Sequence, residues 1–137
     1  MVEIREVTPA FAVAPQIQPS DIPALRERGI VALICNRPDG EEEGQPSVAA
    51  MRSAAEEAGM AFHHIPVSGG QFPEGAIAAF GAVRRGTKGP ILAYCRTGTR
   101  SITLDTLADP EGLSPAERIE LARAAGYDLS AIAGRLS

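Results

Sequence analysis

The stretch Pro90-Ile-Leu-Ala-Tyr-Cys95-Arg-Thr-Gly-Thr-Arg100-Ser101 decides the fold. It begins with an apolar run of strand length, which brings Cys95 to the carboxyl end of a strand. A helix is expected directly afterwards, over Ser101–Leu107. The loop between them contains one glycine, so successive backbone N–H groups can turn inward and form an anion-binding nest. The stretch therefore predicts a strand, an anion-binding loop and a helix start in one unit.

Two similar apolar runs, Gly29–Cys35 and Met60–Val67, predict further strands with both faces covered. Between and after the strands, helical patterns and stop signals predict helices over 21–28, 46–58, 73–85, 114–126 and 129–136. Strands that alternate with helices of this length indicate βαβ units. We therefore expect an α/β fold with a central, mainly parallel sheet and helices on both faces.

Smaller signals refine this pattern. Residues 2–7 and 11–13 have short β-like patterns. Ser20 is expected to cap the helix over 21–28, and Asp128 the last one. Ligands of such sheets bind outside the carboxyl ends of the strands. The Cys95 loop and the turn Asn36–Gly40 are both expected at that edge.

Composition limits the possible classes of protein. The chain has 137 residues, 45% hydrophobic and 22% charged, which is typical of one globular domain over 1–137. The net charge of −4 gives no overall basic field for nucleic acid. No apolar run is long enough for a membrane span, and the first residues do not resemble a signal peptide. Two cysteines are too few for a secreted disulfide scaffold, so a cytoplasmic setting is expected.

Cys95 is the candidate nucleophile. A helix N-terminus and nearby arginines favour the thiolate form of a cysteine. Arg100 is placed to hold a tetrahedral oxyanion with its planar fork, whereas Arg96 is expected to point outward or to shape the entrance of the anion-binding loop. Thr97, Gly98, Thr99 and Ser101 would complete the anion-binding loop. The alternative is that Cys95 is a buried residue at a strand end and the arginines belong to the surface.

The loop resembles the active-site loop of cysteine-dependent phosphatases, and more closely that of single-domain rhodaneses. The whole chain resembles the phosphatase-like domain of the bacterial beta-lactamase-hydrolase-like proteins, a family described variously as phosphatase or sulfurtransferase. The matching segments are Gln18-Pro-Ser-Asp, Asn36-Arg-Pro-Asp-Gly-Glu, Gln45-Pro-Ser, His64-Ile-Pro-Val-Ser-Gly-Gly, the Cys95 loop and Ala125-Gly-Tyr-Asp. This resemblance implies an architecture like that of the dual-specificity phosphatases.

Two features depart from the phosphatase pattern. Protein phosphatases of this fold have Cys-x5-Arg, whereas Cys95 and Arg100 give Cys-x4-Arg, the spacing usual in rhodaneses. The resemblance also leads us to expect a general acid after the middle strand, where this chain has Val67-Ser68-Gly69-Gly70. Asp39 and Glu41 lie in or beside the turn after a neighbouring strand and are substitutes, although both also suit an ordinary surface turn. Glu74 is better explained as a first-turn helix residue.

Several other residues are accessory candidates. Cys35 ends a strand at the same edge as Cys95, so it is either a core residue or a partner in a reversible disulfide. His64 is expected to be a structural hydrogen-bond partner, and Asn36 and Arg37 could add to the anion site. Ser101 could donate to the Cys95 thiolate or cap the following helix. No metal site or cofactor is expected.

Three functions are compatible with the sequence. The first is hydrolysis of a small phosphate ester through a phosphocysteine at Cys95, and the second is rhodanese-type sulfur transfer through a Cys95 persulfide. The third is non-catalytic anion binding. All three predict a small anionic ligand, either a phosphate ester or a sulfane-sulfur donor. The second would also suit a partner enzyme of sulfur metabolism.

Overall fold

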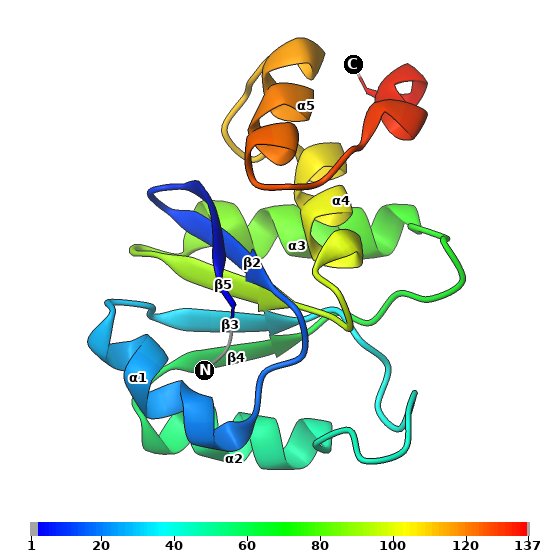
Figure 1. Ribbon diagram of the computed structural model, residues 1–137. Helices are drawn as coiled ribbons and strands as arrows, with labels where there is room; N and C mark the ends of the chain where they lie inside the picture. Colours follow the sequence, from blue (N-terminus) through cyan, green and yellow to red (C-terminus); the bar gives the residue numbers. More distant parts are fainter. Residues whose placement is uncertain (1–2, 137) are drawn as a thin grey trace.

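A five-stranded sheet with helices on both faces forms the centre of the structure, a computed structural model that describes residues 3–136 (Figure 1). Val2, where the first β-like pattern starts, and residue 137 of the expected domain lie outside the described residues. The strands are β1 (Arg5–Thr8), β2 (Phe11–Ala14), β3 (Ala32–Cys35), β4 (Ala61–His64) and β5 (Ile91–Tyr94). Their order in the sheet is β1-β2-β5-β3-β4. Only β1 is antiparallel to its neighbour, so the predicted mainly parallel α/β sheet is confirmed.

The helices form two layers. They are α1 (Ile22–Glu27), α2 (Val48–Glu57), α3 (Glu74–Gly86), α4 (Thr99–Ala108) and α5 (Pro115–Ala124), with 3-10 segments at Pro19–Asp21 and Ser130–Arg135. Figure 1 shows α1 and α2 on one side of the sheet and α3, α4 and α5 on the other. Because every second strand residue faces the same layer, the buried residues form one core cluster on each side.

The strand register brings the candidate residues to one edge. Cys35 lies opposite Tyr94 on one side and opposite His64 on the other. Cys95 follows β5 directly, and Asn36 follows β3. Because these strands are parallel, both residues leave the sheet at the same edge, as the sequence predicts. No helix within residues 3–136 is long and apolar enough to cross a membrane.

Several expected boundaries are wrong. The run from Gly29 forms a strand only from Ala32, because Gly29, with a φ of 94°, and Ile30 complete the turn that ends α1: the Ile30 N–H donates to the Leu25 carbonyl at 3.2 Å. Ser20 is not a cap, since it lies inside the 3-10 turn that precedes α1.

The two loop-to-helix junctions in the C-terminal half also differ from expectation. The helix after the Cys95 loop begins at Thr99, two residues earlier than expected. The last expected helix is a 3-10 segment, although Asp128 does accept a hydrogen bond from the Ser130 N–H at 3.0 Å.

Candidate active site

The Cys95 loop joins β5 to α4 and encloses the sulfur. Cys95 is fully buried, and the Gly98 N–H donates to its Sγ atom at 3.1 Å. α4 begins one residue later, so the unpaired N–H groups of its first turn lie beside this loop. A backbone donor on the sulfur and a helix start next to it are the two features of an anion-binding nest.

Gly98 is required by both its conformation and its surroundings. Its φ of 95° lies in the left-handed region, which side chains other than glycine rarely adopt. A Cβ atom there would overlap the hydroxyl of Tyr127, which donates to the Thr97 carbonyl at 3.0 Å. Tyr127 thus packs against the loop from the far end of the chain, and residue-type reasoning missed it. Its only signal was its place in the matching segment Ala125-Gly-Tyr-Asp.

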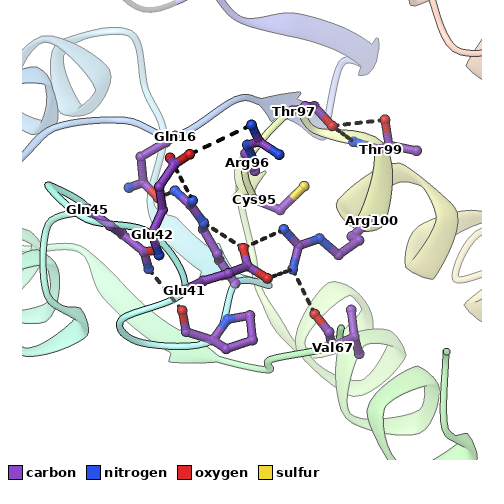
Figure 2. A network of polar contacts seen from close by, with 12 residues as sticks. Gln16, Glu41, Glu42, Gln45, Val67, Cys95, Arg96, Thr97, Thr99 and Arg100 are labelled. Carbon is purple, nitrogen blue, oxygen red and sulfur yellow. Dashed lines mark hydrogen bonds and ion pairs between the residues drawn. The ribbon is translucent and has the colours of Figure 1, made fainter. Parts of the chain in front are cut away.

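Arg100 turns into the site and is held there. Its Nη1 donates to Oε2 of Glu41 at 3.0 Å and to the Val67 carbonyl at 2.9 Å, and its Nη2 donates to Oε1 of Glu41 at 2.8 Å (Figure 2). The hydrogen bonds with Glu41 are the largest cause of the raised pKa of Arg100. Figure 2 shows the guanidinium bound to Glu41 and lying beside the Cys95 side chain.

Arg37 is a second buried cation at the site. Only 2% of its side chain is exposed, and its Nε donates to Oε1 of Glu41 at 2.8 Å. Its Nη1 and Nη2 donate to Gln16 and Glu42 at 3.0 and 3.1 Å. Arg37 thus supports the site through Glu41. Its two Nη atoms bind Gln16 and Glu42, which residue-type reasoning missed.

Glu41 is ionised in this arrangement. The hydrogen bond from Arg100, together with that from Arg37, lowers its pKa to about 2 against the opposing effect of burial. At neutral pH the carboxylate therefore carries no proton to donate. Glu41 lies in the site as the sequence suggested, but as a partner of two arginines and not as a general acid.

Asn36 and Ser101 connect β3 to α4. The Ser101 hydroxyl donates to Oδ1 of Asn36 at 2.8 Å, and Nδ2 of Asn36 donates to the Ile65 carbonyl at 2.9 Å. Ser101 therefore neither caps α4, where Gly98 holds the cap position, nor donates to Cys95. The expected cap role of Ser101 and its expected bond to Cys95 are wrong because its hydroxyl bonds across to the neighbouring strand end, whereas its place in the anion-binding loop stays a prediction.

The remaining accessory residues support the backbone around the site. Nε2 of His64 lies 2.9 Å from the Arg37 carbonyl, to which the Cys35 thiol also donates at 3.5 Å. Asp39 accepts from the Val48 N–H at 3.2 Å, so it stabilises the start of α2 and does not face Cys95. No group of three or more potential ligands is arranged to hold a metal among the described residues.

Cys35 and Cys95 are both free thiols. Burial raises the pKa of Cys35. Cys35 shares a face of the sheet with its register partner Tyr94, and alternation turns the next residue after Tyr94 to the other face. The register therefore does not pair the two sulfurs, and a reversible disulfide between them remains a prediction.

The outer rim of the loop is polar. The Arg96 side chain is 65% exposed and lies 3.7 Å from Glu42, which agrees with its expected outward direction. Thr97 and Thr99 bond to each other through their hydroxyls at 3.1 Å. An open cavity of about 350 Å³ flanks this rim, lined by Gln16, Gln18, Arg37, Glu42, Glu43, Gly44, Gln45, Pro46 and Arg96.

The architecture is that of cysteine-based phosphatases. Its fold matches that of a kinase-associated phosphatase, solved with its catalytic-site cysteine replaced by serine, with a TM-score of 0.71 at 14% identity, covering 97% of this chain and 89% of that one. The fold is also similar to that of a Neisseria meningitidis protein with a provisional phosphatase assignment. That structure gives a TM-score of 0.84 at 36% identity, covering 98% of this chain and 96% of the other.

The chain belongs to the family of the phosphatase-like domain of beta-lactamase hydrolase-like proteins. The model of this family matches residues 3–112. A beta-lactamase hydrolase-like protein from Agrobacterium fabrum is 39% identical over 123 residues, 88% of this chain. The chain spans only 28% to 30% of the length of the curated relatives it matches. The resemblance stated from the sequence is confirmed.

Proposed function

We propose that residues 1–137 form one phosphatase-like domain that hydrolyses a small phosphate ester with Cys95 as nucleophile. The observation that carries this proposal is the position of the Cys95 sulfur, which accepts a hydrogen bond from the Gly98 N–H and lies beside the Arg100 guanidinium (Figure 2). An electron-rich sulfur faces the phosphorus in such a pocket, while backbone N–H groups and the arginine fork hold the phosphoryl oxygens. Membership of a phosphatase-like family supports the same reaction.

The reaction has two steps. The Cys95 thiolate attacks phosphorus, a P–S bond forms and the P–O ester bond breaks, so that the leaving oxygen departs with the bonding electrons and takes a proton from water. Water then attacks the phosphocysteine, the P–S bond breaks, and inorganic phosphate leaves with the thiolate restored.

Protonation of the leaving oxygen limits the choice of substrate. Glu41 is ionised, Asp39 stabilises the start of α2, and Glu74 lies exposed in the first turn of α3. General-acid catalysis contributes about 10²- to 10⁴-fold where it operates. We therefore expect the best substrates to have leaving groups that need little protonation, such as aryl phosphates.

Sulfur transfer is the second candidate, favoured by the Cys-x4-Arg spacing. In that reaction the Cys95 thiolate attacks the sulfane sulfur of thiosulfate, the S–S bond breaks, and sulfite leaves. The resulting persulfide then passes its outer sulfur to cyanide or a thiol. No general acid is needed, and the Gly98 N–H would bind the outer sulfur.

One pair of assays separates the candidates. The protein is incubated with p-nitrophenyl phosphate, and separately with thiosulfate plus cyanide. We expect phosphate release that is lost in Cys95→Ser, because a serine hydroxyl is a far weaker nucleophile than a thiolate at neutral pH. Thiocyanate formation without phosphate release would support sulfur transfer, and no reaction in either assay would leave anion binding.

A further inference from the structure

We propose that Glu41 is a positioning residue for the reaction at Cys95: its carboxylate holds one edge of the Arg100 guanidinium and turns the other edge toward the sulfur. The inference rests on the proposed function. It extends that function by assigning a role to a side chain outside the Cys95 loop, on the segment that follows β3.

The contacts of Arg100 leave a defined pair of donors for a ligand. A guanidinium has five N–H bonds, two on each Nη and one on Nε. Glu41 and the Val67 carbonyl take both N–H bonds of Nη1 and one of Nη2. The edge formed by Nε and the second N–H of Nη2 is not used by these contacts.

This second edge suits the ligand. Paired N–H bonds on one edge of a guanidinium bind two oxygens of a phosphate-like anion in parallel. Figure 2 shows the Arg100 guanidinium beside the Cys95 side chain, with the edge that Glu41 and Val67 leave unused turned toward it. An oxyanion bound to the second edge would therefore lie against Cys95, as an attack on phosphorus requires.

Glu41 can hold Arg100 because it is itself held. Its Oε1 atom also accepts from Nε of Arg37, whose side chain is 2% exposed, whereas that of Arg100 is 18% exposed. A continuous series of contacts thus runs from buried Arg37 through Glu41 to Arg100. Without Glu41, the long Arg100 side chain would keep only the Val67 carbonyl among its hydrogen bonds on that edge.

The same contact has an opposite interpretation that the experiment must exclude. A carboxylate on Arg100 could instead compete with the substrate anion for the guanidinium. Removing a competitor tightens anion binding, and so does removing any nearby negative charge. Loss of a positioning group weakens anion binding and slows turnover. The sign of the change therefore decides between the two.

The test measures tungstate affinity by calorimetry and p-nitrophenyl phosphate turnover in Glu41→Gln and Glu41→Asp. Glu41→Asp keeps the charge but is too short to reach both arginines. We expect tungstate to bind more weakly in both variants and kcat/KM to fall by about 10- to 100-fold, as for a displaced catalytic group. We expect kcat to fall as well as KM to rise, with a decrease in Tm of no more than about 8 °C, as for a loss of about 1 kcal/mol.

Glu43→Gln is the matched control. It removes one charge from the same exposed segment, and the Glu43 side chain makes no hydrogen bond or ion pair among the described residues. We expect tungstate affinity and turnover in Glu43→Gln to stay within about twofold of the starting protein, the range of a surface substitution.

Unchanged or tighter tungstate binding in both Glu41 variants would overturn the positioning role. Tungstate binding does not require turnover, so the outcome is separable from a failure of the proposed hydrolysis. A protein that binds tungstate in a Glu41-dependent way but hydrolyses no phosphate ester would contradict only the proposed function. No tungstate binding by the unsubstituted protein would overturn both.

Discussion

Two arginines share one carboxylate at the centre of the site. Arg37 and Arg100 both donate to Oε1 of Glu41, at 2.8 Å in each case. The side chain of Glu41 is 28% exposed, so solvent screens part of its attraction to each arginine. The contribution to stability comes from the two ion pairs acting as one network. The same contacts keep Glu41 ionised over almost the whole accessible pH range.

This network predicts a pH dependence of stability. The pKa of Glu41 is about 2 in the folded protein against an ordinary value of 4.5, so folding favours the ionised form. Its contribution is fully present above pH 4.5 and is lost as pH falls toward 2. Urea unfolding should show Glu41→Gln less stable by about 1 kcal/mol at neutral pH.

The difference in unfolding free energy between Glu41→Gln and the unsubstituted protein should disappear near pH 2. Glu43→Gln, which removes a charge from the same segment, should not reproduce it. A Glu41→Gln difference that stays constant with pH would show that the carboxylate is not stabilised by its arginines.

At the scale of elements, the loop between β5 and α4 depends on one backbone conformation. Gly98 adopts a φ of 95° and approaches Tyr127, whose hydroxyl binds the Thr97 carbonyl. The position of the Gly98 N–H on the sulfur follows from that turn. A contact with the segment after α5 thus helps to set the geometry of the loop.

Replacement of Gly98 by alanine should therefore damage the site. A side chain in the left-handed region costs about 1–2 kcal/mol, and here the new Cβ also overlaps the Tyr127 hydroxyl. We expect phosphate-ester turnover, measured in a kinetic assay, to fall more than tenfold. Tm, measured by thermal unfolding, should also decrease.

Gly112→Ala is the control. Gly112 also has a positive φ, of 70°, but a Cβ atom there would meet open space. It should lower Tm slightly and leave turnover unchanged. Equal turnover in Gly98→Ala and the unsubstituted protein would contradict the account of the loop.

The elements and the Cys95 loop were predictable because local patterns encode them. The apolar runs before Cys35 and Cys95 predicted two parallel strands, and the structure shows that these strands, β3 and β5, are direct neighbours. The start of α1 was predicted to within one residue but its cap was not, because a 3-10 turn over Pro19–Asp21 precedes the helix and the capping box of that turn uses Gln18 and Asp21. Ser20 and the pair Gln18 and Asp21 are competing cap candidates within four residues, and residue preference alone does not decide between them.

The partners within the site were predictable only in part. Arg100 and Glu41 were marked by their positions after neighbouring strands. Gln16 and Tyr127 were not, since their side chains reach the site through hydrogen bonds with residues 21 and 30 positions away. Such pairings depend on the packing of whole elements, and no spacing in the sequence records them.

At the scale of the whole molecule, Arg84 connects the helices on one side of the sheet with each other and with the sheet. Its Nε donates to Asp105 on α4 at 2.7 Å and its Nη2 to Glu111 at 2.6 Å, while its guanidinium lies over the Phe11 ring at 4.6 Å. Burial raises the pKa of Asp105 to about 6, and the charge of Arg84 opposes this. One cation thus links α3, α4 and the sheet beneath the active-site helix.

Arg84→Met should therefore be strongly destabilising. Breaking a buried ion pair costs about 3–5 kcal/mol because the partner charge stays buried. Without Arg84 the pKa of Asp105 should rise further, so stability should fall more steeply as pH increases through 6. Urea unfolding on both sides of that pH measures the effect.

Arg85→Met, a change at an exposed position on the same helix, is the comparison and should alter stability by less than about 0.5 kcal/mol. Equal stability of the two variants would contradict the role given to Arg84.

The most direct test of the central claim is the mass of the intact protein, quenched in acid during turnover of p-nitrophenyl phosphate. A phosphocysteine predicts a mass increase of one phosphoryl group, located by peptide fragmentation on Cys95 and missing from Cys95→Ala. Phosphate release without any such adduct, or with an adduct on another residue, would contradict the account.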